Sequence, residues 1–273
     1  MKKIIFLSLI ISLIIGSCAN NKPVEKTLLG MWTDYYLIPN TLKGNVKEVQ
    51  ELNYWAIDKD GKITKGELMT RKDLDSIGST NNFKAYFDDK GTLTKYDLLS
   101  GGNVIESHIG TIENGKCIRW DYKLKDSTSY YIIPEYDNLG QLIGAAGYRP
   151  LADTLVNKLV LAYNSKGNCT RFEYFNSKKQ KTGYHVCSLD EKGNIIEAKY
   201  FNKKDSLTYT LTNIYDKNGS IIKQQTVVEK PKSTGTWDYK DLKFDEHGNW
   251  IETYANIDNG KYKIFAERSY IYY

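Results

Sequence analysis

An acidic stretch near the start of the chain has the spacing of a calcium loop and is the first candidate for chemistry. Asp58, Asp60, Gly61 and Glu67 occupy the third, fifth, sixth and twelfth places of an EF-hand loop. The first place holds Ala56 instead of an acid, and no flanking helices are apparent. Seven related segments lack the terminal glutamate. We therefore interpret the stretch as a turn and expect neither a metal site nor a cofactor.

Histidines and paired acids are the residue types that most often carry acid–base chemistry. His108, His185 and His247 are far apart in the sequence, and His247 lies inside a turn. No Gly-x-Ser-x-Gly elbow, phosphate loop or Cys-x-x-Cys pair occurs. Two acids could meet across strands as a glycosidase pair, but most acids lie in turns or beside lysines. We expect that the protein is not an enzyme, and a hydrolytic activity is the third alternative for its function.

The cysteines offer two interpretations. Cys117 and Cys169 follow turns at a position where related segments have Ile, Leu or Trp, so their thiols can act as small buried apolar groups. If the hairpin between residues 169 and 187 is centred on Lys178, Cys169 and Cys187 lie directly opposite each other. An oxidising compartment would permit a disulfide between them. A bridge and buried free thiols both remain open.

The first residues form a secretory signal. Lys2 and Lys3 precede an apolar run that ends at Cys18, and this run is too short for a membrane span of about 20 residues. Ile15-Gly16-Ser17 before Cys18 resembles the bacterial lipobox. That resemblance implies cleavage before Cys18 and attachment of three acyl chains to it, which anchors a protein firmly.

These features divide the chain into three parts. Residues 1–17 are the signal peptide, residues 18–30 a lipidated tether, and residues 31–273 a single β-repeat domain. Loss of Lys2 and Lys3 lowers the formal charge from +5 to +3. This small surplus is spread along the chain, so we expect no nucleic-acid partner and no polybasic membrane patch.

One turn motif recurs along the chain. It has an apolar residue, then Asp or Asn, two variable residues, a glycine, one further residue and a second apolar residue. Asp at the first turn position and a left-handed glycine at the fourth are typical of a three-residue hairpin loop with a glycine bulge. A shortened copy contains Asn114-Gly115, a preferred pair for a two-residue hairpin. The turn glycines are Gly61, Gly91, Gly115, Gly140, Gly167, Gly193, Gly219 and Gly248.

The apolar residues on either side of each turn should face each other across the hairpin and fix its register. The predicted pairs are Ile57–Ile63, Phe87–Leu93, Tyr136–Leu142, Tyr163–Cys169, Leu189–Ile195, Tyr215–Ile221 and Phe244–Trp250.

The spacing of the glycines predicts the fold class. Steps of 24 to 30 residues indicate a repeat, clearest over residues 50–252, and a second, looser turn divides each unit into two strands. We predict an all-β antiparallel meander of about eight hairpins, curled into a barrel, a shell or a solenoid, because a sheet beyond about 10 strands rarely stays open. Residues 66–80 could hold one short helix and residues 149–158 one helical turn. The C-terminal residues read as a closing strand.

Tyrosine is abundant, with 22 residues, and several runs place aromatic residues on both faces of a strand. Both faces of a sheet cannot belong to the same core. Some rings should therefore be exposed unless the sheet is covered, and exposed aromatic patches mark binding sites. Aromatic packing inside a barrel is the other interpretation.

The repeat resembles the YD-repeat, or Rhs-type, class of bacterial envelope proteins. Tyr136-Asp137 with Gly140 and Tyr215-Asp216 with Gly219 match the motif best. The likeness covers roughly residues 50–273, although the period here is longer and the large shell and toxin module are missing. A MORN-like repeat is the runner-up. The class implies carbohydrate or protein binding, an expectation that rests on fold-level analogy.

We therefore expect a non-catalytic, lipid-anchored binding or scaffold protein of the cell envelope, located at the outer membrane, with a glycan or protein partner. The alternative is a periplasm-facing outer-membrane lipoprotein that acts in envelope assembly or ligand shuttling. A wide, closed apolar interior would favour shuttling, and an open flat sheet would favour scaffolding.

Overall fold

The computed structural model describes residues 42–77, 82–125, 127–217 and 219–273. Within them the chain is almost entirely β-structure, with one short α-helix, α2 (Arg71–Ser76), and one 3-10 turn, η1 (Pro150–Ala152). The strands are β1 (Val46–Lys59), β2 (Lys62–Leu68), β3 (Asn82–Phe87), β4 (Leu93–Ser100), β5 (Asn103–Glu113), β6 (Lys116–Leu124), β7 (Ser127–Tyr136), β8 (Leu142–Arg149), β9 (Thr154–Tyr163), β10 (Cys169–Asn176), β11 (Lys181–Leu189), β12 (Ile195–Asn202), β13 (Leu207–Tyr215), β14 (Ile221–Glu229), β15 (Lys232–Phe244), β16 (Trp250–Ile257) and β17 (Tyr262–Tyr272).

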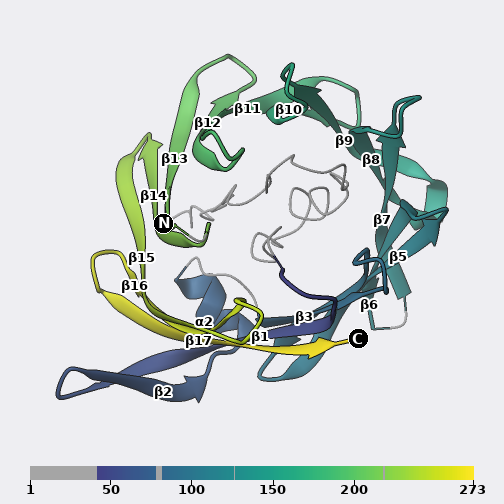
Figure 1. The fold of residues 1–273 in the computed structure, drawn as a ribbon. Helices are drawn as coiled ribbons and strands as arrows, with labels where there is room; N and C mark the ends of the chain where they lie inside the picture. Colours follow the sequence, from purple (N-terminus) through teal and green to yellow (C-terminus); the bar gives the residue numbers. More distant parts are fainter. Residues whose placement is uncertain (1–41, 78–81, 126, 218) are drawn as a thin grey trace.

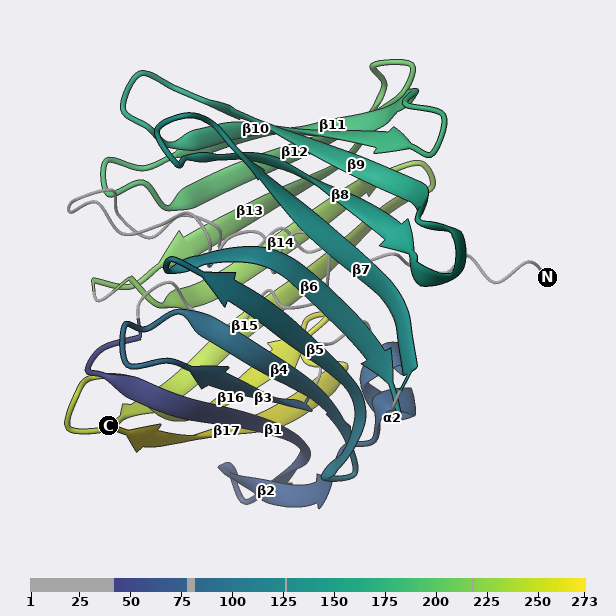
Figure 2. The same ribbon diagram turned by 90° about the vertical axis from the view of Figure 1, so that its right-hand side faces the viewer.

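The meander closes into a 16-stranded antiparallel barrel (Figure 1). Each strand from β3 to β17 pairs with the next, and β17 then pairs with β1 over Val46–Tyr272 to Trp55–Ile264. The other edge of β1 pairs with β3, which completes the ring. Strand β2 pairs with the distal part of β1, and this hairpin projects outside the ring of strands (Figure 1, Figure 2). The sequence left barrel, shell and solenoid open, and the pairing of the last strand with the first decides for the barrel.

The predicted turn chemistry is observed. In the turn after β3, the amides of Lys90 and Thr92 donate to the Asp88 carboxylate, and the Gly91 amide donates to the Asp88 carbonyl. The turns that begin at Asp137, Asn164, Asp190 and Asp245 repeat this pattern. All eight turn glycines have a positive φ, between 75° and 85°.

Six of the seven predicted cross-strand pairs are confirmed, from Phe87–Leu93 to Phe244–Trp250. The pair Ile57–Ile63 is wrong. Asp60 and Gly61 both have positive φ and form a two-residue turn without a bulge, so Ile63 lies opposite Asp58 and Ile57 lies opposite Thr64.

In two of the repeats the second turn is not looser than the first. After β10, the amides of Lys178 and Gln180 donate to the Asn176 side chain, and Lys179 takes the left-handed position with φ of 57°. After β12, Asn202 and Asp205 repeat the arrangement. In these two units both turns are therefore built by the same side-chain chemistry, with a lysine or an aspartate in place of glycine in the second.

The helical segments fall where the sequence predicted them. Thr70 caps α2 through a capping box with Asp73. Its one buried side chain, Leu74, packs with Met69, Ile257 and Ile264. Since α2 lies within the ring of strands in Figure 1, this contact identifies the side of β16 and β17 that faces the interior. Among the residues described here, no helix is long and apolar enough to cross a membrane.

Candidate functional site: the inner wall of the barrel

Alternation along each strand separates two walls of opposite character. Ile264 faces inward, so Ala266 and Arg268, which follow it at every second position of β17, face inward too. The register of the ladder places Val49 of β1 on the same side and extends this assignment, strand by strand, to the rest of the barrel. Inward side chains are mostly buried and apolar or aromatic. The largest fully buried ones in this wall include Phe83, Tyr96, Ile132, Leu142, Leu159, Phe172, Ile195 and Leu211.

The first notable feature of the inner wall is a line of rings on four neighbouring strands. Tyr96, His108, Tyr122 and Tyr130 are register partners on β4, β5, β6 and β7. The His108 ring lies 3.8 Å from the Tyr122 ring, centroid to centroid, and the Tyr122 ring lies 5.3 Å from that of Tyr130. Glu106 forms a hydrogen bond with His108. One aromatic residue per strand, at the same level, thus produces a continuous aromatic stripe.

A second cluster of the same kind lies on β10 to β13 and contains Tyr174, His185, Tyr200 and Tyr209. The two ring nitrogens of His185 lie 3.0 Å from the Tyr174 hydroxyl and 2.6 Å from the Tyr209 hydroxyl. Burial lowers the pKa of His185 to about 3. The imidazole is therefore neutral at neutral pH, with one nitrogen that donates and one that accepts.

Glycines in the inner wall give these rings room. A Cβ on Gly183 would lie 2.4 Å from the Tyr200 hydroxyl, and a Cβ on Gly110 would lie 2.9 Å from the Trp120 ring. Both glycines have ordinary backbone angles for a strand. They are therefore explained by close packing of a ring against the backbone of the neighbouring strand.

A buried ion pair lies at the seam where the last strand meets the first. Arg268 on β17 donates to Glu51 on β1 at 2.7 and 2.8 Å, and both side chains are almost fully buried. The Arg268 guanidinium lies 3.9 Å from the centre of the Trp250 ring. Burial raises the pKa of the Glu51 carboxyl, although Arg268 acts in the opposite direction. Charge and hydrogen bonding are thus concentrated at the closure of the barrel.

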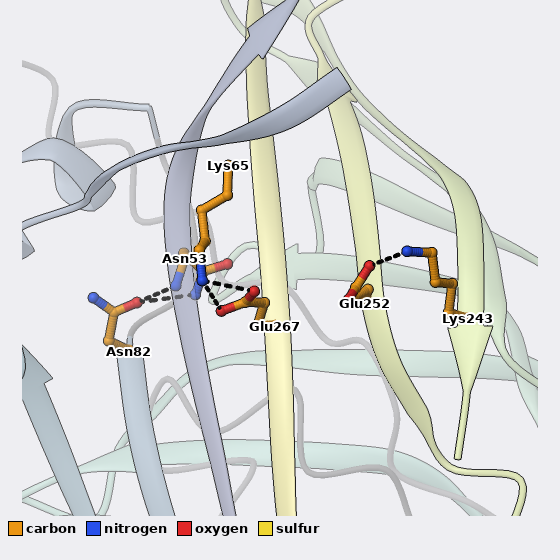
Figure 3. Close-up of polar contacts among 6 residues, drawn as sticks. All are labelled: Asn53, Lys65, Asn82, Lys243, Glu252 and Glu267. Carbon is orange, nitrogen blue, oxygen red and sulfur yellow. Dashed lines mark hydrogen bonds and ion pairs between the residues drawn. The ribbon is translucent and has the colours of Figure 1, made fainter. Parts of the chain in front are cut away.

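The outer wall is charged. Outward-facing ion pairs recur around the barrel, and Figure 3 shows two of them, Lys65 with Glu267 and Lys243 with Glu252. Glu252 and Glu267 are opposite each other on β16 and β17, so two acids do meet across strands. Each is engaged by a lysine on this partly exposed wall, which is not the cleft that a glycosidase pair requires. Figure 3 also shows Asn82 and Asn53, which join β3 to β1.

Aromatic residues do occur on both walls, but cationic side chains cover several of the outer rings. The Arg119 guanidinium lies 3.8 Å from the centre of the Tyr131 ring, and Arg171 lies 4.0 Å from that of Tyr184. Each of these rings also stacks on an aromatic neighbour. The outer aromatic residues are therefore explained by packing under arginine.

The cysteines are free thiols in the structure, and Cys117, Cys169 and Cys187 are all buried. The expected direct opposition of Cys169 and Cys187 is wrong, because a bulge after Tyr174 shifts the register so that Phe172 faces His185. A disulfide between them stays a prediction. A mass lower by two hydrogens in the unreduced protein would show it, and full alkylation of the unfolded, unreduced chain would exclude it.

The remaining predicted site residues divide into two groups. Cys18 lies outside the described residues. Asp58 and Gly61 of the calcium-like stretch form a turn, in which Asp58 accepts from the Gly61 amide and from Lys263 at 2.7 Å. In the part of the chain that the structure describes, no three His, Cys, Asp or Glu side chains converge as metal ligands.

Sequence reasoning did not identify the histidine clusters. His108 and His185 are 77 positions apart and contact different tyrosines, so their distance in the sequence concealed a shared role. A usable signal was present in the alternation. Tyr122 and Tyr130 are opposite each other in the hairpin β6–β7, as are Tyr200 and Tyr209 in the hairpin β12–β13. Each histidine lies on the strand before its hairpin.

No known protein-family model matches the chain, and no curated protein matches it in sequence. Solved structures align with most of the chain, and the first of those below has a TM-score above 0.5 and bears on the fold. A porin-like protein from Bacteroides uniformis has a TM-score of 0.51 and 9% identity, over 84% of this chain and 98% of that chain. A porin-like protein from Bacteroides vulgatus has a TM-score of 0.46 and 11% identity, over 83% and 98%. A putative outer membrane lipoprotein-sorting protein domain from Vibrio parahaemolyticus has a TM-score of 0.23 and 8% identity, over 82% and 85%.

Proposed function

We propose that this chain is a non-catalytic, lipid-anchored protein of the bacterial cell envelope that binds a lipophilic ligand against the inner wall of its barrel. The observation that carries the proposal is the arrangement of polarity, with apolar and aromatic side chains turned inward and ion pairs turned outward. This is the arrangement of ligand-carrying barrels in water, in which the interior holds the apolar cargo.

The charged outer wall argues against the barrel itself as a membrane pore. A lysine or arginine on the lipid-facing side of a transmembrane barrel costs about 2–4 kcal/mol at the midplane. Arg119, Lys158, Arg171 and Lys199 all lie on the outer wall beside acids. The likeness to porin-like proteins therefore concerns the fold, and the proposed attachment to the membrane is through Cys18.

The width expected for a barrel of sixteen strands supports the proposal that a ligand binds inside it. Barrel diameter increases roughly in proportion to strand number, and eight strands enclose just enough space for side chains or one small ligand. Sixteen strands enclose a much wider interior. A closed, aromatic-lined interior also favours the ligand-shuttling alternative over the open scaffold among the functions that we inferred from the sequence. We also propose that the chain is a lipoprotein built from YD-like repeats.

Ligand binding is tested by extraction and by a probe. Organic extraction of protein purified from envelopes should release lipid, and a fluorescent fatty-acid analogue should bind the delipidated protein. Tyr200→Ala, on the inner wall, should weaken probe binding at least about tenfold through loss of apolar contact. Tyr184→Ala, on the outer wall of the adjacent strand, should not. Absence of lipid and probe binding, or equal loss in both variants, would contradict the proposal.

Location is tested separately with a C-terminal epitope tag. Replacing residues 1–17 by a signal that is cleaved without lipidation, together with Cys18→Ala, should make the protein extractable from membranes by high salt, because the acyl chains would be lost. Protease added to intact cells should leave the tag intact, and permeabilisation should expose it. Loss of the tag from intact cells would instead place the domain on the cell surface, where a glycan or protein partner becomes the better explanation.

A further inference from the structure

The antiparallel meander places alternate turns at opposite ends of the barrel, and this separates charge. Seven turns of the glycine type, from residues 88–92 to 245–249, join odd to even strands at the end of the barrel that holds the C-terminus (Figure 2). The intervening connections lie at the other end, on the side of α2. Because the two kinds of turn differ in composition, the two rims differ in charge.

The glycine-turn rim is acidic. Its seven connections contain four lysines and eight acids, namely Lys90, Lys166, Lys192, Lys217, Asp88, Asp89, Asp137, Asp190, Glu191, Asp216, Asp245 and Glu246. Several of these carboxylates accept turn amides, so part of the negative charge is used locally.

The opposite rim carries a group of lysines on three successive hairpins, β10–β11, β12–β13 and β14–β15. We call this group the lysine rim; it consists of Lys178, Lys179, Lys181, Lys203, Lys204, Lys230 and Lys232. All except Lys181 are exposed. The nearby acids are Asp205, which lies 3.8 Å from Lys181, and Glu229. A small charge surplus spread along the sequence predicted no polybasic membrane patch, whereas the fold brings these lysines to one rim.

Exposed apolar side chains lie at the same end of the barrel, on the two preceding connections. Leu151 in η1 is fully exposed, and Leu124 at the end of β6 is about half exposed, at 51%. Lysines next to exposed leucines suit a lipid bilayer with anionic headgroups, since the lysines attract phosphate and the leucines can enter the interface. Nucleic acid would use the lysines but not the leucines.

We propose that the lysine rim docks on an anionic phospholipid surface, with Leu124 and Leu151 at the edge of the contact. This interaction is additional to the lipid anchor and to ligand binding inside the barrel. Docking would place the α2 end of the barrel against a bilayer, which is the geometry that transfer of a lipophilic ligand would use.

The test uses the mature chain from residue 18 with Cys18→Ala, so that neither an acyl chain nor the apolar signal of residues 1–17 contributes, and vesicles of phosphatidylcholine with or without phosphatidylglycerol. The protein should bind only the phosphatidylglycerol vesicles, and binding should weaken as salt is raised. Lys178→Glu, Lys203→Glu, Lys204→Glu and Lys232→Glu together should weaken binding at least about a hundredfold, from roughly fivefold per lysine near such a surface.

A matched variant has the same charge change at the other rim, with Lys90→Glu, Lys166→Glu, Lys192→Glu and Lys217→Glu. It should keep most of the binding. Leu151→Ser should weaken binding severalfold, whereas Leu139→Ser, an equally small change at a 93% exposed leucine of the glycine-turn rim, should not. No vesicle binding, equal loss in both lysine variants, or binding to an oligonucleotide but not to vesicles would overturn the proposal. Binding of the fatty-acid probe to the inner wall is measured without vesicles. Failure of vesicle docking would therefore leave the proposed ligand binding intact, and failure of probe binding would leave vesicle docking intact.

Discussion

At the scale of single residues, the buried histidines make stability depend on pH. Burial lowers the pKa of His185 to about 3, whereas an unfolded histidine titrates near 6.5. Between these values the unfolded chain binds a proton that the folded chain does not. Stability therefore falls as the pH falls from about 6.5 towards 3, by up to about 1.4 kcal/mol per pH unit for this group.

We predict that His185→Gln flattens this dependence. The measurement is the urea midpoint of unfolding between pH 7 and pH 4 for the wild type and the variant. Ser188→Gln is the control, since Ser188 is an exposed residue of the same strand without a titratable group, so its replacement should leave the slope unchanged. The same slope in wild type and His185→Gln would contradict the prediction.

The left-handed turn positions give a second prediction, with different outcomes at two similar sites. Gly167 has φ of 79° and open space where a Cβ would lie, so Gly167→Ala should cost about 1–2 kcal/mol through the backbone alone. Lys179 already occupies such a position with φ of 57°.

Lys179→Gly has two opposing effects. Glycine removes the backbone strain of a positive φ in the folded chain, but it also gives the unfolded chain more conformational freedom. The free energy of unfolding should therefore stay within about 0.5 kcal/mol of the wild type. Chemical denaturation of both variants tests this. An equal loss of stability in Gly167→Ala and Lys179→Gly would show that the positive φ does not determine the effect of the substitution.

At the scale of the strands, packing of rings onto glycine couples neighbouring strands. The nearest atoms to a Cβ on Gly110 of β5 all belong to the Trp120 ring of β6, at 2.9 to 3.1 Å. We predict that Gly110→Ala costs about 1–3 kcal/mol through overpacking. The same change should cost much less in a Trp120→Leu background, because the ring would be gone. A double-mutant cycle measures the coupling, and equal costs in the two backgrounds would contradict it.

At the scale of the whole molecule, the Glu51–Arg268 pair stabilises the closed barrel. Arg268→Met should destabilise the protein by about 3–5 kcal/mol, because the Glu51 carboxylate would be left buried without its cationic partner. Glu51→Leu combined with Arg268→Met should recover at least half of that loss.

The control for the seam is Lys84→Met. Lys84 pairs with Glu48 between β3 and β1, but on the outer wall, where screening by water limits its loss to below about 1 kcal/mol. Thermal unfolding of the three variants is the measurement. A similar loss for Lys84→Met and Arg268→Met would show that burial of the pair is not what matters.

The local structure of the hairpins could be predicted from the sequence. Asp or Asn at the first turn position and glycine at the fourth specify a hairpin wherever they occur, and six of the seven flanking pairs followed from them. The first motif failed because positive φ at both Asp60 and Gly61 makes a two-residue turn, which removes the bulge. The single bulge after Tyr174 likewise separated Cys169 from its expected partner. One residue gained or lost in a ladder changes every pairing beyond it.

Which face of each strand is inside, and where the barrel closes, could be established only from the fold. Alternation along a strand indicates that its two faces differ in polarity. Closure of β17 onto β1 then turns one face of each of the sixteen strands inward. The same closure brings Arg268 on the last strand to Glu51 on the first, and it bends the sheet edge that carries the lysines of three hairpins into one rim. Both features depend on where the ring closes, and a repeat that specifies each hairpin in the same way does not specify that point.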